Sequence, residues 1–132
     1  MPTVFDPLRG KEVALTPEEK VRQGFISLLR DVCAVPPSLM NSEVAFSYGQ
    51  KRFRADIVVF DRKGAPLMVV ECKNEDVPLS SLTARQALRY HAALNVSYIA
   101  LTNGRKCHIY GKDPCGRFLP LDHIPHYEEM LR

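Results

Sequence analysis

The sequence lacks any apolar run long enough to cross a membrane. A spanning helix needs about 20 consecutive, mostly apolar residues, and no segment of this chain approaches that length. The N-terminus, MPTVFDPLRGKEV, also lacks the apolar core of a secretory signal. We therefore expect a cytoplasmic protein with no membrane partner.

Paired metal-binding or disulfide-forming cysteines are missing as well. The cysteines form no C-x-x-C pair, and their spacing fits none of the common zinc-site patterns. Free thiols in a reducing cytosol are the simplest interpretation. The four cysteines are Cys33, Cys72, Cys107 and Cys115.

What the sequence does contain is the material of one compact domain. It has 132 residues, of which 45% are hydrophobic and 25% charged, and this is enough apolar matter for a core. The net charge of +3 permits a polyanionic partner without requiring one. The clustered cations are either a solvated surface or part of a binding face. They are Lys51, Arg52, Arg54, Arg85, Arg89, Arg105 and Lys106.

A first helix has a clear beginning. Thr16 suits the N-cap, Pro17 suits the first helical position, and Glu19 completes a Thr-x-x-Glu capping box. Residues 1–15, before this helix, contain turn signals and are expected to form an extended arm. The apolar residues of the helix share one face; they are Val21, Phe25, Leu28, Leu29 and Val32.

Five strands and a second helix are expected after the first helix. The predicted strands are 43–48, 51–60, 67–73, 96–103 and 105–111. The second helix covers about 82–95, is capped by Ser80 or Ser81, and packs through Ala87, Tyr90 and Leu94. Asn103-Gly104 is a typical hairpin turn.

These elements predict an α/β fold with one mixed sheet flanked by helices. Their order is α-β-β-β-α-β-β, and both faces of 57–60 and 67–70 are apolar, which is typical of interior strands. We expect the domain to cover residues 16–118, between the arm and a tail of 119–132. The tail is predicted to end in a short helix after Pro125.

Three charged residues lie where the sheet should be buried. Asp56 is inside the second strand, and Glu71 and Lys73 end the third. Residues two apart share a face of a strand, so Glu71 and Lys73 project together while Cys72 points away. The two strands are consecutive and should be neighbours, which places Asp56 beside Glu71.

Two buried carboxylates need compensation. An unpaired buried charge costs several kcal/mol, and Lys73 alone cannot balance both Asp56 and Glu71. A divalent cation such as Mg²⁺ can, because it binds one or two carboxylates and keeps several waters. The alternative is an internal ion cluster without a metal.

These residues also carry a resemblance. RADIVVF and VVECKN resemble the P-D…(D/E)-x-K nuclease superfamily, although Ala55 stands where the superfamily has proline. Together with QALRY and ALTNG they are similar to the N-terminal nuclease domain of the type I restriction enzyme R subunit. The resemblance covers about residues 16–111 and implies a restriction-endonuclease-like core.

The resemblance implies roles for individual residues. Asp56 and Glu71 would bind Mg²⁺ or Mn²⁺ with the main-chain carbonyl of Cys72, and Lys73 would activate the attacking water and stabilise charge on the phosphate. Glu43 or Glu19 would be a further acid, with Glu43 preferred because the capping box already explains Glu19. Gln86 and Tyr90 match the family's Gln-x-x-x-Tyr and would support the site or touch the nucleic acid, with a core aromatic as the alternative for Tyr90. We expect similar supporting or nucleic-acid-binding roles for Glu19, Arg54 and Arg89.

The resulting expectation is a metal-dependent nuclease that hydrolyses DNA phosphodiester bonds. A catalytically silent module that binds nucleic acid or serves assembly is the second hypothesis, and a purely structural domain is the third. The restriction subunit also carries a translocating ATPase, but this sequence has no G-x-x-x-x-G-K-[ST] phosphate loop. We therefore expect no translocation along DNA, and the resemblance leaves homodimer formation open.

Overall fold

The computed structural model describes residues 1–132, apart from the side chain of Tyr48. No helix among the described residues has the length and hydropathy needed to cross a bilayer. The helical elements are α1 (Pro17–Asp31), η1 (Pro37–Leu39), α2 (Ser81–His91) and α3 (Tyr127–Met130). The strands are β1 (Thr3–Asp6), β2 (Lys11–Ala14), β3 (Met40–Tyr48), β4 (Lys51–Phe60), β5 (Pro66–Cys72), β6 (Tyr98–Thr102), β7 (Cys107–Lys112) and β8 (Phe118–Leu121).

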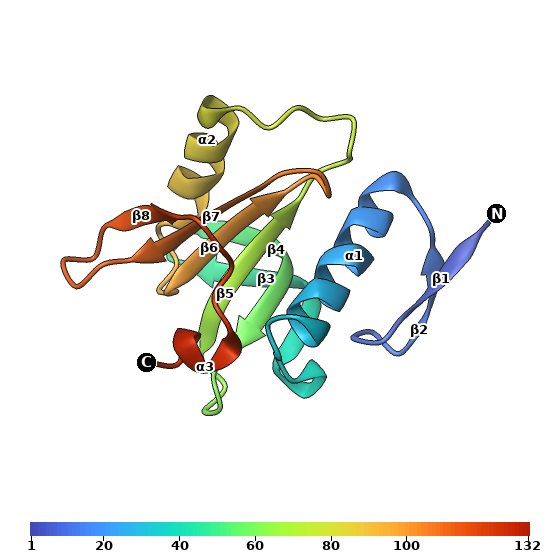
Figure 1. The fold of residues 1–132 in the computed structure, drawn as a ribbon, viewed down its shortest axis with the longest axis horizontal. Coiled ribbons are helices and arrows are strands. Elements are labelled where there is room, and N and C mark those ends of the chain that lie inside the picture. The colour runs from blue at the N-terminus through green and yellow to red at the C-terminus, as the bar shows by residue number, and fades with distance from the viewer.

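The sheet at the centre has six strands in the order β3-β4-β5-β6-β7-β8 (Figure 1). β5 and β6 are parallel, and the other neighbouring pairs are antiparallel. α2 makes the crossover between the two parallel strands, as a parallel pair requires. The predicted mixed sheet with flanking helices is confirmed.

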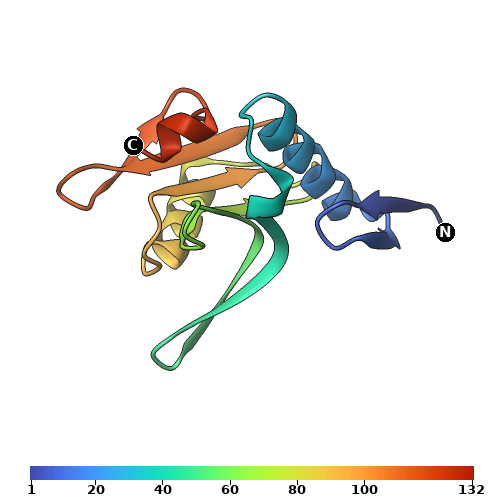
Figure 2. The same cartoon turned by 90° about the horizontal axis from the view of Figure 1, so that it is seen from below.

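The helices cover both faces of this sheet. Figure 2 shows α1 and α3 on one side and α2 on the other. Ile26 and Leu29 of α1 pack in one core cluster with Met68 and Val70 of β5. On the opposite face, Val69 lies in a second cluster with residues that follow α2. Apolar residues on both faces of β4 and β5 are therefore explained by helices on both sides.

The N-terminal segment differs from its prediction. Instead of an extended arm it folds into the antiparallel hairpin β1–β2, next to α1 (Figure 1). Asp6 is fully buried and accepts hydrogen bonds from the backbone N–H of Leu8 and from Arg9. Gly10, with φ of 65°, supplies the left-handed backbone that lets the chain turn back into β2.

The structure also differs from the prediction at the ends of both long helices and in one edge strand. α2 ends at His91 rather than near residue 95, and Leu94 packs from the loop that follows. Val32 caps α1 and is 66% exposed, so it is not part of the buried face. The edge strand β8 was missed, because its Pro120 and mostly exposed side chains do not have the pattern of a buried strand. The short helix after Pro125 is confirmed as α3.

Candidate functional site

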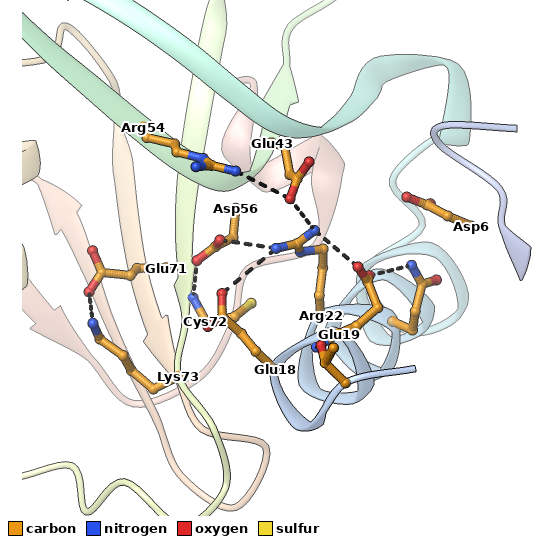
Figure 3. Close-up of polar contacts among 12 residues, drawn as sticks. Asp6, Glu18, Glu19, Arg22, Glu43, Arg54, Asp56, Glu71, Cys72 and Lys73 are labelled. Carbon is orange, nitrogen blue, oxygen red and sulfur yellow. Dashed lines mark hydrogen bonds and ion pairs between the residues drawn. The ribbon is translucent and has the colours of Figure 1, made fainter. Parts of the chain in front are cut away.

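The two strands that carry the predicted acids are neighbours. Ile57 of β4 pairs with Val70 of β5, and Asp56 and Glu71 are the residues next to this pair in the chain. The Asp56 Oδ2 atom accepts a hydrogen bond of 2.7 Å from the backbone N–H of Cys72 (Figure 3). The strand pairing and this hydrogen bond therefore bring Asp56 next to the end of β5, the strand that carries Glu71.

Glu71 and Lys73 share a face, which also agrees with the prediction. The Lys73 Nζ atom lies 3.3 Å from Glu71 Oε2 (Figure 3). Cys72 between them points the other way into the core beneath α1, and burial raises the pKa of its thiol. The side chain of Cys72 is therefore part of the packing rather than of the site.

His91 is a site residue that the sequence reasoning missed. Its Nε2 atom lies 3.2 Å from Glu71 Oε1, and its side chain is 1% exposed. The hydrogen bond from His91 holds the pKa of the Glu71 carboxyl below its ordinary value. Burial raises this pKa, and the charge of Lys73 lowers it further. The sequence did indicate that His91 is buried, because it follows Ala84 by seven residues and Ala87 by four, on the same face of α2.

Arg22 was missed too, and it changes the charge balance. This guanidinium, with 4% exposure, lies 3.3 Å from Asp56 Oδ1 (Figure 3). The premise that Lys73 is the only cation available to Asp56 and Glu71 is therefore wrong, since Arg22 pairs with Asp56. The sequence did contain a signal: Arg22 is four and seven residues before Ile26 and Leu29, within the buried stripe of α1.

Glu43, predicted as a further acid, does reach the same cluster. Its carboxylate lies 3.3 Å from guanidinium nitrogens of Arg22, Arg9 and Arg54. Burial raises the pKa of the Glu43 carboxyl, but the three arginines outweigh burial and the net shift is downward. With φ of 53°, Glu43 adopts a left-handed backbone, which is strained for a non-glycine residue in a strand.

The capping role predicted for Glu19 is only half correct. The Thr16 hydroxyl accepts a hydrogen bond of 3.1 Å from the Glu19 backbone N–H, as an N-cap should. The Glu19 carboxylate does not complete the box. It accepts hydrogen bonds from Arg9 at 2.6 Å, Arg22 at 3.2 Å and Gln23 at 3.0 Å. Compensation of Arg9 and Arg22 is therefore the function of this buried side chain.

Gln86 and Tyr90 lie beside Glu71 on the exposed side of α2. They line a hollow of about 350 Å³ together with Glu71, Lys73 and Arg54. Tyr90 is 43% exposed, so the prediction that it packs against the core is wrong. The buried residue at this end of α2 is its neighbour His91.

The hollow continues along α2. The ring of Tyr90 lies 5.0 Å from that of Phe53, and Tyr90 also lines an adjoining hollow with Lys51 and Arg89. Arg54 therefore lines the hollow next to Glu71, and Arg89 lines the adjoining one.

The carboxylate and carbonyl oxygens at this site are the type of ligand that a hard divalent cation prefers. Over the described residues, no three His, Cys, Asp or Glu side chains converge as a ready metal centre. Mg²⁺ needs only one or two carboxylates, because waters complete its shell. The ion pairs around the site join six carboxylates to four Arg or Lys cations, which leaves an excess of negative charge. The carboxylates are Asp6, Glu18, Glu19, Glu43, Asp56 and Glu71, and the cations are Arg9, Arg22, Arg54 and Lys73. Arg22, however, already holds one oxygen of Asp56.

The chain matches one family of known proteins over most of its length. The family model described as the type I restriction enzyme R protein N terminus matches residues 17–125. The hairpin β1–β2 lies outside this region. No curated protein matches the chain.

Two solved structures share the fold. One is a fragment of a candidate HsdR subunit of a type I restriction enzyme from Vibrio vulnificus, with 24% identity and a TM-score of 0.58 over 90% of this chain. This chain covers 26% of that fragment, about a quarter of its length. The other is a candidate nuclease of the DUF820 group from Anabaena variabilis, with 14% identity and a TM-score of 0.51, covering 92% of this chain and 76% of that one.

Proposed function

Because the chain belongs to the family of the type I restriction enzyme R protein N terminus, we propose that it is a nuclease domain that hydrolyses DNA phosphodiester bonds with Mg²⁺ or Mn²⁺. The observation that supports this most directly is the hydrogen bond that Asp56 of β4 accepts from Cys72 of β5, next to Glu71, with the Lys73 cation 3.3 Å from Glu71. This combination of two carboxylates, whose oxygens are hard ligands, and an exposed cation suits phosphoryl chemistry.

In this proposal the residues have separate tasks. Asp56, Glu71 and the main-chain carbonyl of Cys72 would hold the cation, with Glu43 as a further carboxylate nearby. When bound, the metal would polarise a phosphoryl oxygen and lower the pKa of a water. Lys73 is 41% exposed, which would let its ammonium group approach the scissile phosphate and stabilise the charge that develops there.

DNA would approach over the exposed side of α2. Arg54 and Arg89 can bind phosphates bidentately, and such contacts position a nucleic acid without reading its sequence. Gln86 and Tyr90 border both hollows, so they would touch the backbone or support Lys73. The task of these residues in the proposal is therefore to hold the substrate over the acids.

A cleavage assay on plasmid and on short linear DNA tests the proposal. We expect cleavage with Mg²⁺ or Mn²⁺, and a loss of about 10²–10³-fold in Lys73→Ala, as for other residues that stabilise transition-state charge. Asp56→Asn should abolish cleavage and Mn²⁺ binding measured by calorimetry. Lys63→Ala, in an exposed loop, is the matched control. Full cleavage by Lys73→Ala would contradict its assigned role.

A catalytically silent binding or assembly module is the second candidate. The contact of Arg22 with Asp56 favours it, because that guanidinium supplies the positive charge that a metal would otherwise bring. This candidate predicts salt-dependent DNA binding by the metal-free chain. It also predicts no Mn²⁺ binding and no cleavage with any metal or substrate. The same calorimetry and cleavage assays therefore separate the two functions.

A further inference from the structure

The last residue of α2 approaches the proposed site from inside the protein. His91 shares the buried helix face of Ala84 and Ala87, and these alanines pack with Leu101 of β6. Leu101 pairs with Glu71 in the parallel ladder of β5 and β6. The docking of α2 on the sheet therefore sets the imidazole against the Glu71 carboxylate.

The two oxygens of Glu71 have different partners. His91 Nε2 lies 3.2 Å from Oε1, and Lys73 Nζ lies 3.3 Å from Oε2. A carboxylate accepts hydrogen bonds and donates none when ionised, so the proton must be on His91 Nε2. Held at both oxygens, the Glu71 carboxylate keeps one orientation.

Packing alone does not explain a histidine at this position. Over the described residues, His91 Nδ1 is buried and has no hydrogen-bond partner. A buried nitrogen without a partner costs free energy, and leucine or methionine would fill the same space without that cost. The hydrogen bond with Glu71 is the one polar interaction of the ring among the described residues, and it accounts for the choice of residue.

We propose that His91 is a positioning residue, which acts through Glu71 by fixing the direction in which its carboxylate is presented to the metal. This inference rests on the proposed function, since it concerns the same site. Loss of a residue that hydrogen-bonds to a metal ligand typically lowers metal affinity or activity by about 10–100-fold.

Two substitutions separate positioning from packing. His91→Leu keeps the volume and removes the donor, whereas His91→Gln keeps an N–H donor at a similar reach. We expect Mn²⁺ affinity, measured by calorimetry, to fall about 10–100-fold in His91→Leu and to be largely rescued in His91→Gln. With DNA, His91→Leu should lower kcat and leave KM nearly unchanged. Leu82→Gln, on the exposed side of α2, is the control.

A metal-free measurement tests the interaction itself. Spectra of ¹⁵N-labelled protein should show the Nε2–H tautomer for His91, and Glu71→Ala should remove this preference. Equal Mn²⁺ affinity in His91→Leu and the unmutated chain would overturn the inference, as would failure of His91→Gln to rescue in a folded protein. Absence of Mn²⁺ binding by the unmutated chain would overturn the proposed function, and the tautomer alone would then decide whether His91 holds Glu71.

Discussion

At the scale of single residues, Arg22 has more ion-pair partners than the other cations around the site. Its buried guanidinium contacts Glu19, Glu43 and Asp56 at 3.2–3.3 Å, and Glu18 at 3.8 Å. Removing one partner of a buried ion pair leaves uncompensated charge in the interior, and this costs more than the pair itself contributes.

Arg22→Ala should therefore destabilise the fold strongly. We expect a loss of about 3–5 kcal/mol in the free energy of unfolding, measured by urea denaturation. Arg30→Ala is the matched control, because it removes an exposed arginine paired with Asp31 on the same helix; there we expect a loss of about 0–1 kcal/mol. Similar losses in the two variants would contradict the view of Arg22 as a buried counter-charge.

Glu71 should make the stability depend on pH. Its pKa is lower when folded than when unfolded, with the His91 hydrogen bond as the first cause. On acidification the unfolded chain takes up its proton first, so the stabilisation is full above the unfolded-state pKa of about 4.3 and is lost as the pH falls through the folded value.

Urea unfolding between about pH 3 and pH 6 should then separate two variants. Glu71→Gln should reduce the loss of stability on acidification relative to the unmutated chain. Glu12→Gln, at an exposed position of β2, should leave the dependence on pH as it is. An unchanged profile in Glu71→Gln would show that the native contacts of Glu71 do not favour its ionised form.

At the scale of elements, the hairpin β1–β2 is attached to the site by one side chain. Arg9 pairs with buried Asp6 inside the hairpin, with Glu19 on α1, and with Glu43 on β3. The hairpin therefore takes part in the charge balance of the cluster, although it lies outside the matched family region.

Arg9→Ala should loosen the hairpin more than the rest of the fold. We expect faster amide hydrogen exchange over residues 3–14, because Asp6 loses its counter-charge while buried. Amides in α1 and the central strands should keep most of their protection. Lys11→Ala removes an exposed cation from the same hairpin and should leave exchange nearly unchanged. Equal exchange rates in the two variants would contradict the view that Arg9 attaches the hairpin to α1 and β3.

At the scale of the whole molecule, the net charge of +3 is too small to define a binding face, so the placement of the cations matters. Lys51 and Arg89 line the hollow that adjoins the one next to Glu71. Lys63 lies in the loop between β4 and β5, at the opposite end of the sheet from α2 (Figure 1).

Two double variants with the same net charge test this placement. Lys51→Ala with Arg89→Ala should reduce the slope of log affinity against log salt by about two, one for each phosphate that the protein no longer neutralises. Arg30→Ala with Lys63→Ala should leave the slope unchanged. DNA binding is measured by fluorescence anisotropy in EDTA, so that cleavage does not interfere. Equal slopes would place the binding face elsewhere.

The sequence by itself determined the succession of α1, β3, β4, β5, α2, β6 and β7, and the shared face of Glu71 and Lys73. Thr16 and Pro17 begin α1, and Asn103-Gly104 turns the chain between β6 and β7, because such signals act between near neighbours. The alternation of side chains in a strand is equally local, and it was enough to put Glu71 and Lys73 on one face.

Only the tertiary structure decided what surrounds those acids. Arg22 is 34 residues from Asp56, and His91 is 20 residues from Glu71. No local rule joins residues that far apart; the contacts exist because α1 and α2 dock on opposite faces of the sheet (Figure 2). Charge compensation in a buried site depends on such docking, and for this reason the sequence could indicate the acids but not their partners.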